Sequence, residues 1–302
     1  MYVGGLRSFG LLVAVSVLVV CSLGSVAAEH HWTINPDLQL RSYGTANLPP
    51  AIPWAADETL VWGEVRMFGG SDHTLSAGLR AGVGEGSEGQ FTVIRLEGSG
   101  EDAAGNTIKS TGTLIGLDYK WLAHQDERMT VSVVPGLEYP IERLKSENQT
   151  IGGSATSDRF IPVFSVPLEW QLENGTILSV VPRYVGFDSA PRNWRADGTQ
   201  DGTVDGFGQV IAIGVGVLHQ DIEYSLMADL QVPIAGDNSI DIATNTPTRE
   251  IVWSAGGSWH GDGSSARVDL FATNAFGPTA ASSMMATADN NVGFGLRVSG
   301  EF

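Results

Sequence analysis

The sequence is poor in cysteine, in basic residues and in helix-forming stretches, and each shortage narrows the range of possible functions. Its one cysteine, Cys21, lies in an N-terminal segment that we expect to be removed, which excludes disulfide bonds and thiol chemistry from the mature chain. Lysine and arginine number 17 against 34 aspartate and glutamate residues, and the net charge is −17. Such an acidic chain repels nucleic acid and lacks a basic patch for anionic lipid head groups.

Residues 1–28 have the features of a secretory signal peptide. Arg7 is the lone basic residue, residues 11–20 form an apolar core, and small residues at 26–28 suit cleavage before Glu29. A retained membrane anchor is the alternative, which the short apolar core disfavours. An exported chain of this size without disulfide bonds needs either a large core or a closed barrel in a membrane.

From residue 59 onward, apolar residues alternate with polar or small ones. Within 115–121, for example, large apolar residues alternate with Gly116, Asp118 and Lys120. Stretches of about ten residues with this repeat are the length that a tilted strand needs to cross a membrane. The expected strands are 60–68, 74–83, 90–97, 112–123, 128–142, 159–172, 176–187, 208–218, 221–234, 248–259, 265–273 and 291–302.

The connections between these strands alternate between short and long. The short ones are 84–89, 124–127, 173–175, 219–220 and 260–264, and the long ones are 98–111, 143–158, 188–207, 235–247 and 274–290. Transmembrane barrels have short periplasmic turns and long external loops, whereas a soluble β-sandwich has no reason to sort its loops.

We therefore predict an all-β protein, a closed antiparallel transmembrane β-barrel of about twelve strands over residues 59–302. The signal peptide occupies residues 1–28. Residues 29–58, which contain a proline cluster, form an irregular N-terminal periplasmic extension or a short plug. A secreted soluble β-sandwich that binds a partner is the alternative fold.

The last strand, 291–302, carries a further signal. Phe294, Leu296 and Val298 take alternate positions, and the chain ends on Phe302. This stretch resembles the C-terminal strand of bacterial outer-membrane β-barrel proteins, in which such a terminal phenylalanine is read by the barrel-assembly machinery. The resemblance identifies no subfamily. It implies a porin-like barrel in the outer membrane, in contact with outer-membrane lipid, lipopolysaccharide and the assembly machinery, with the last strand paired to the first.

Three prolines conflict with uninterrupted strands. Pro135, Pro167 and Pro182 lie inside expected strands, although proline cannot donate a ladder hydrogen bond. Because every strand of a closed barrel has two neighbours, we expect bulges at these positions or strands that end before them.

The barrel prediction makes the inward-facing side chains the candidate functional residues. By alternation, the charged residues expected to line the lumen are Glu64, Arg66, Arg80, Arg95, Asp118, Lys120, Glu138, Glu169, Arg183, Glu223, Asp229, Arg267, Asp269 and Arg297. A barrel of about twelve strands lies between those of about eight, which side chains fill, and those of about sixteen, which hold an aqueous channel. We predict a porin-like channel for small polar solutes or ions, with a mild preference for cations. The alternative is a lumen filled by salt bridges, in a non-conducting barrel with a structural or surface-binding role.

Signals for catalysis are weak. A barrel hydrolase needs a serine with a histidine in reach, whereas His124, His219 and His260 fall in or beside expected periplasmic turns. We expect no enzymatic activity and no cofactor.

A calcium site is a weak candidate in one external loop. Asp197, Asp201 and Asp205 recur every four residues among glycines. The ligands of the EF-hand loop instead come from every second residue, so the spacing favours a solvated loop over a calcium site.

Overall fold

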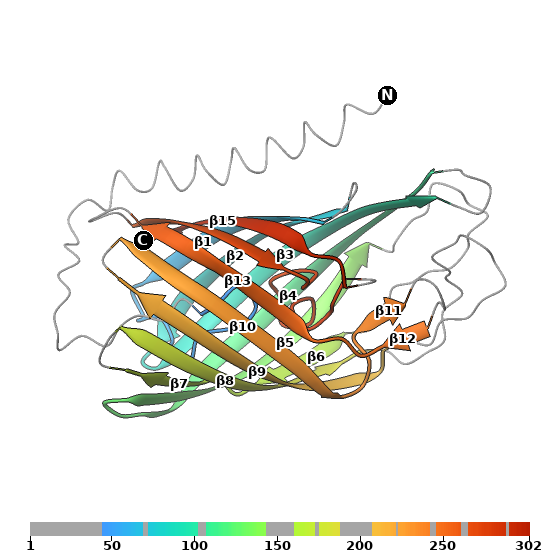
Figure 1. Ribbon diagram of the computed structural model, residues 1–302. Coiled ribbons are helices and arrows are strands. Elements are labelled where there is room, and N and C mark those ends of the chain that lie inside the picture. Colours follow the sequence, from blue (N-terminus) through green and yellow to red (C-terminus); the bar gives the residue numbers. More distant parts are fainter. Residues whose placement is uncertain are drawn as a thin grey trace.

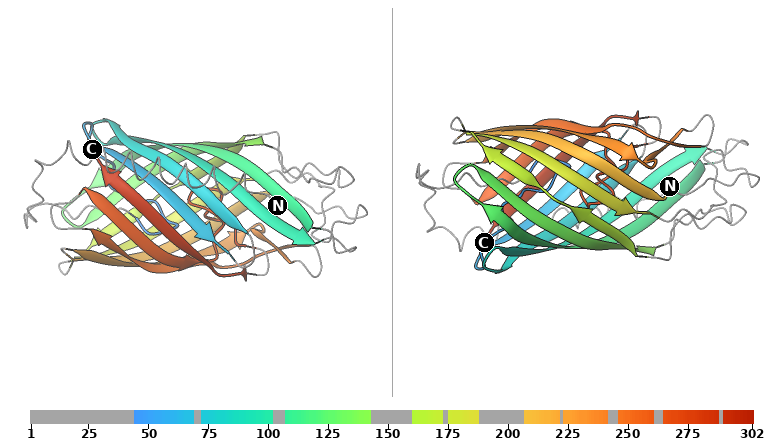
Figure 2. Two further views of the ribbon diagram at one scale, coloured as in Figure 1. Left: turned by 90° about the horizontal axis from the view of Figure 1, so that it is seen from above. Right: turned by 90° about the horizontal axis from the view of Figure 1, so that it is seen from below.

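The computed structural model describes residues 44–68, 72–101, 107–142, 160–172, 175–187, 207–221, 223–241, 246–260, 265–287 and 290–302. Its strands wind into a closed, tilted barrel (Figures 1 and 2), which confirms the all-β transmembrane-type fold that the sequence predicts. The barrel strands are β1 (Thr59–Met67), β2 (His73–Gly84), β3 (Ser87–Glu101), β4 (Thr107–Gln125), β5 (Met129–Glu142), β6 (Ile161–Ser165), β7 (Leu168–Gln171), β8 (Thr176–Gly186), β9 (Gln209–Gln220), β10 (Tyr224–Ala235), β13 (Val252–His260), β14 (Ala266–Thr273) and β15 (Gly293–Glu301). In the described part of the chain, no helix is long and apolar enough to cross a membrane.

Antiparallel pairing continues around the whole ring. The sheet runs from β4 through β3, β2, β1, β15, β14, β13, β10, β9 and β8 to β6 and β7 and then β5, and the β4–β5 pairing closes it. The first and last strands pair from Leu60↔Glu301 to Met67↔Phe294. Closure removes the exposed strand edges of an open sheet and rules out the β-sandwich alternative.

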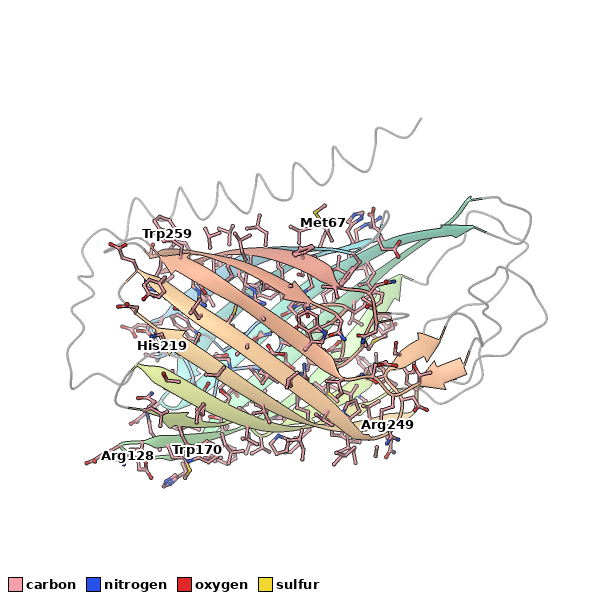
Figure 3. All side chains as sticks on the ribbon, viewed as in Figure 1. Met67, Arg128, Trp170, His219, Arg249 and Trp259 are labelled. Atoms are coloured by element: carbon pink, nitrogen blue, oxygen red, sulfur yellow. The ribbon has the colours of Figure 1, made fainter. Side chains whose placement is uncertain are left out.

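The distribution of polarity is the reverse of that in a water-soluble protein. Alternate residues of β9 and β10, such as Val215 and Leu226, are apolar and face outward with 51% and 58% of their surface exposed. Figure 3 likewise shows Met67 and Trp259 pointing away from the barrel. Along the barrel strands, the residues at the intervening positions face inward, and many of them have polar or charged side chains. An apolar outer wall around a polar interior is the arrangement of a barrel that crosses a lipid bilayer.

The conflict over Pro167 and Pro182 is resolved at one irregular point. The expected strand 159–172 is interrupted at Val166 and Pro167, which separates β6 from β7, and both parts pair with β5 and β8. The carbonyl oxygen of Pro182 in β8 accepts a hydrogen bond from the Val166 N–H at 3.0 Å. Pro182 has no backbone N–H, and the edge of β8 on which this donor is missing therefore faces the interruption between β6 and β7. Counted as one broken strand, β6 and β7 complete a barrel of twelve strands.

Pro135 also coincides with an interruption. The β4–β5 ladder is present at Asp118↔Gly136 and resumes at Trp121↔Val133, so the position of Pro135 is left out. Pro135 keeps its pairing with Phe164 of β6 on the other side. The missing N–H of Pro135 therefore interrupts the β4–β5 ladder over a short stretch but does not end the strand.

Two segments expected to be loops contain strands. β3 and β4 extend to Glu101 and from Thr107, beyond the expected ends at 97 and 112. The residues added there are mostly polar or glycine, so hydrophobic alternation gave no sign of them. β11 (Ser239–Asp241) and β12 (Thr246–Thr248) form a separate two-stranded hairpin that begins in the expected loop 235–247 and ends one residue beyond it, and both strands are too short for a periodicity test.

Candidate functional site

Most of the charged residues that alternation predicts for the lumen are buried in the barrel interior. The buried ones are Glu64, Arg66, Lys120, Glu138, Glu169, Arg183, Asp229, Arg267 and Asp269. Arg80, Asp118 and Arg297 are partly buried and line a central cavity.

The structure places two of the predicted lumen residues elsewhere. Arg95 has the opposite parity to the buried Thr92 and Ile94, and its side chain is 45% exposed on the outer face, where its Nε donates to Glu97 at 2.6 Å. Both faces of this strand carry apolar residues, so alternation could not identify the inward face. Glu223 precedes β10 and is exposed at the barrel rim.

An arginine and carboxylate cluster covers the inner face of β1, β14 and β15. Glu64 accepts hydrogen bonds from the Nε of Arg66 at 2.6 Å and from the Nε of Arg297 at 2.7 Å. The Nε of Arg267 donates to Asp269 at 2.6 Å. These residues are two positions apart on one strand or opposite one another on neighbouring strands, which is why they share a face. Pairing lowers the cost of burying the charges without making the cluster a large source of stability.

A second charged group lies on the inner face of the neighbouring strands β2, β3 and β4. Lys120 donates to both oxygens of Glu88, at 3.1 and 3.2 Å, and Arg80 donates to the amide oxygen of Gln90 at 2.7 Å. Glu88 is buried on the inner face of β3 and is absent from the predicted lumen residues. Glu88 falls within the expected turn 84–89, whereas β3 already begins at Ser87.

Residues 44–54, which we call the inner segment, lie inside the barrel. Thr45 donates to the Oδ2 of Asp229 at 2.6 Å, and the Nδ2 of Asn47 donates to its Oδ1 at 3.1 Å. Further along, the Ala51 carbonyl accepts from the Ser132 hydroxyl, and the Trp54 N–H donates to Glu88 at 3.1 Å. The sequence predicts either a periplasmic extension or a short plug for residues 29–58, and the contacts of residues 44–54 are those of a plug. Residues 29–43 lie outside the described part of the chain.

Residues 274–287, which we call the β14–β15 segment, also fold into the interior. The expectation that 274–290 is a long external loop is therefore wrong for these residues. Glu138 accepts hydrogen bonds from the Thr279 hydroxyl at 2.9 Å and from the Ala281 N–H at 2.6 Å. No charged residue occurs between 274 and 287, and small residues dominate. That composition, unusual for a solvated loop, is the signal that could have predicted burial.

Arg183 connects the two internal segments. Its Nη1 donates to the carbonyl oxygen of Asn47 at 3.1 Å, and its Nη2 donates to the carbonyl oxygen of Ala280 at 2.9 Å. The amide oxygen of Gln231 accepts from the same Nη1, and the amide nitrogen of Gln231 donates to the Ser283 carbonyl at 2.8 Å. One buried guanidinium thus fixes both segments to β8.

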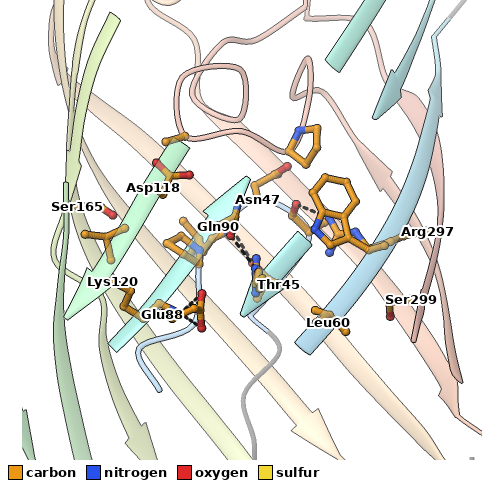
Figure 4. A pocket seen from close by; sticks show the side chains of 18 of the residues that line it. Thr45, Asn47, Leu60, Glu88, Gln90, Asp118, Lys120, Ser165, Arg297 and Ser299 are labelled. Carbon is orange, nitrogen blue, oxygen red and sulfur yellow. Dashed lines mark hydrogen bonds and ion pairs between the residues drawn. The ribbon is translucent and has the colours of Figure 1, made fainter. Parts of the chain in front are cut away.

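A cavity of about 60 Å³ remains between the segments and the wall. Figure 4 shows Asp118 and Lys120 on one side of it, Arg297 on the other, and Asn47 between them. The Oδ1 of Asp118 is buried with no hydrogen-bond partner among the described residues. The polar lining and the volume suit a small number of water molecules.

No group of three or more His, Cys, Asp or Glu side chains that could hold a metal ion occurs in the described residues. The candidate calcium loop with Asp197, Asp201 and Asp205 lies outside the described residues. His219 at the end of β9 is hydrogen-bonded to the Thr176 hydroxyl at 3.0 Å, close to the barrel rim and away from the polar interior.

No protein-family model matches the chain. No curated protein matches it either. Among solved structures, an outer membrane channel from Pseudomonas putida F1 has a TM-score of 0.53 at 10% identity, with 87% of this chain and 100% of that chain covered. The KdgM porin has a TM-score of 0.47 at 10% identity, covering 80% and 99%, and outer membrane phospholipase A from Escherichia coli has 0.39 at 11% identity, covering 88% and 95%. At such low identity the likeness to the channel concerns the fold, which is that of a porin-like outer-membrane β-barrel.

Proposed function

We propose that the protein is an outer-membrane channel that lets small polar solutes or ions cross through the barrel interior. The observation that supports this most strongly is the combination of an apolar outer wall with an inner wall of charged and polar side chains. A barrel that served as a membrane anchor alone would be stable with an apolar or tightly packed interior, whereas charged inner residues favour water and polar solutes.

In the described conformation, the two internal segments narrow the lumen at the level of Arg183. The inner segment and the β14–β15 segment meet at Arg183, and the cavity beside them, about 60 Å³, has room for a small number of water molecules. Our proposal is that a solute passes when one of the two segments moves.

The inner wall has a mixed charge, and selectivity between cations and anions should be weak. Arg66, Arg267 and Arg297 each have a carboxylate partner in direct contact. A mild preference for cations follows from the net charge of −17, which raises the cation concentration near the channel mouths.

The barrel also needs partners for its assembly. We propose that the terminal strand, with Phe294, Leu296, Val298 and Phe302, is read by the barrel-assembly machinery, and that the outer wall contacts outer-membrane lipid and lipopolysaccharide. The pairing of this strand with β1 makes it the strand that seals the ring, which suits a role as an assembly signal.

Recording of purified protein in a planar lipid bilayer tests the channel function. Discrete conductance steps with weak cation preference are expected from protein that shows heat-modifiable mobility on gels, the mark of a folded barrel. Folded protein without steps, even after both internal segments are loosened, would contradict the proposal.

A non-conducting barrel with a structural or surface-binding role is the second candidate. It is favoured by the filling of the interior, where Asn274 and Ser283 are fully buried. Loss of cell-surface binding after shortening of the external loops, in a barrel that never conducts, would select it. We propose no catalytic role.

A further inference from the structure

We propose that the barrel interior contains a specific peptide-binding site, and that the inner segment occupies it as a tethered blocker of the conduction path. This inference rests on the proposed channel function. It adds the ligand of the interior site, the residues that recognise that ligand, and the way in which the channel is closed.

Asp229 on β10 recognises the side chains of the inner segment. Its two oxygens accept from the Thr45 hydroxyl at 2.6 Å, from the Asn47 amide at 3.1 Å and from the Asn47 backbone N–H at 3.3 Å. On the barrel wall, the Ser254 hydroxyl also donates a hydrogen bond to this carboxylate. A buried carboxylate needs several donors, and the inner segment supplies most of them.

Three arginines recognise the backbone of the inner segment. Arg66 and Arg297 both donate to the carbonyl oxygen of Ala46, at 3.2 and 3.1 Å. Arg183 donates to the next carbonyl oxygen, that of Asn47, at 3.1 Å. Because these arginines come from β1, β15 and β8, the segment is held from separate parts of the ring and lies across the lumen.

The barrel wall also matches the inner segment in shape. On β9, a Cβ at Gly214 would lie 2.5 Å from the Leu48 Cδ2, and one at Gly216 would lie 3.1 Å from the Leu48 Cδ1. On β2, a Cβ at Gly82 would overlap with the carbonyl group of Ala55. These inward-facing glycines leave the space that the segment and the residue after it occupy, so the fit is specific and not a loose filling of an empty lumen.

Of the two internal segments, the inner segment is the one that can move out of the lumen. The β14–β15 segment is joined to a ring strand at both of its ends, whereas within the described residues the inner segment is joined to a ring strand only at β1. Water in an open lumen can replace its hydrogen bonds to Asp229 and the three arginines. Ala46 and Trp54 also pack against buried apolar residues of the barrel. Displacement toward the end of the barrel where β1 begins would open the path and leave Asp229 and the three arginines lining it.

The first test is single-channel recording of the full chain with the double substitution Thr45→Ala and Asn47→Ala. Loss of the side-chain hydrogen bonds to Asp229 should raise the open probability by about 10- to 100-fold. The matched control is Thr92→Ala, which removes the same hydroxyl from the inner face of β3, where Thr92 contacts Gln90. The control should behave like the unchanged protein.

A peptide supplied separately tests the binding site itself. A synthetic peptide of residues 44–54 should block the opened variant. The same peptide with alanine at the positions of Thr45 and Asn47 should block it much less, because it lacks the donors for Asp229.

A reversible cross-link guards against a variant that opens through partial unfolding. Leu48→Cys and Gly214→Cys are added to the double-alanine variant, because a Cβ at Gly214 would contact the Leu48 side chain. A disulfide bond needs a Cβ–Cβ separation of about 3.5–4.5 Å. The chain's natural cysteine, Cys21, lies in the expected signal peptide. The oxidised channel should stay closed and should open when a reducing agent is added.

The outcomes separate the two proposals. If the unchanged protein conducts, while the double-alanine variant opens no more than the control and the peptide does not block it, the blocker inference is overturned and the channel function stands. Conductance that is the same in the oxidised and reduced states also overturns it. If no variant conducts in any state, although each is folded, the channel function itself fails.

Discussion

Replacing Glu138 with alanine should release the β14–β15 segment from the barrel wall. Glu138 is fully buried, and its two oxygens accept from the Ala281 N–H at 2.6 Å and the Thr279 hydroxyl at 2.9 Å. After the substitution Thr279 keeps its contact with Ser282 at 2.7 Å, but the Ala281 N–H is left buried without that acceptor. One lost hydrogen bond and one stranded donor together cost about 2–4 kcal/mol.

Local hydrogen exchange measures this cost directly. Because about 1.4 kcal/mol corresponds to a tenfold change in an equilibrium, the opening of the segment near Ala281 should become about 30- to 1000-fold more favourable. Mass spectrometry of peptides covering 274–287, on protein in detergent micelles, reports the change. Exchange in the Glu138→Gln protein should lie between that of the unchanged protein and that of Glu138→Ala, since glutamine keeps one carbonyl acceptor.

A control on the same strand separates a local effect from a general one. Ser132 donates to the Ala51 carbonyl of the inner segment. Ser132→Ala should therefore leave exchange in 274–287 unchanged. Unchanged exchange in the Glu138→Ala protein would refute the view that this carboxylate holds the segment inside.

Three further predictions concern the wall and its rim. Phe302→Ala should lower the fraction of chain assembled in the outer membrane, measured by heat-modifiable gel mobility, and normal assembly would contradict the assembly-signal proposal. Val215→Arg, on the outward face of β9, should destabilise the barrel in lipid vesicles by about 2–4 kcal/mol in urea titrations, with Val215→Leu as the neutral control. Asp126, in the turn before β5, accepts hydrogen bonds from the backbone N–H groups of Arg128 and Met129 and then from His124, which hold its pKa below the ordinary value of 3.8. Its contribution to stability is therefore present above that value and lost as the pH falls through the lower folded pKa, which carboxyl NMR titration would detect.

The barrel could be predicted because lipid imposes a strict pattern on the sequence. Each strand must show apolar residues outward at every second position, and the short connections mark one end of the barrel. The pattern fails where the interior is itself apolar. Ile94 faces inward because it meets Gly277 of the β14–β15 segment, and the parity assigned to Arg95 is wrong for that reason.

The contents of the lumen could not be predicted in the same way. The proline-rich inner segment shows no period, and its partners lie far away along the chain. Thr45 contacts Asp229, 184 residues later, and Asn47 contacts Arg183, 136 residues later. Alternation places the charged residues on the inner wall but says nothing of the neutral segments that contact them.

The pairing of β1 with β15 has a consequence for the order in which the chain folds. Residues 60 and 301 are neighbours in the ring, so the seam can form only after nearly the whole sequence has been delivered. Contacts between such distant residues form slowly, and until they form the chain exposes two unsatisfied strand edges. The inner segment, which precedes β1, must already lie within the curving sheet at that moment or enter afterwards through the end where β1 begins. An intermediate that seals too early would therefore trap an empty barrel with a displaced N-terminal segment.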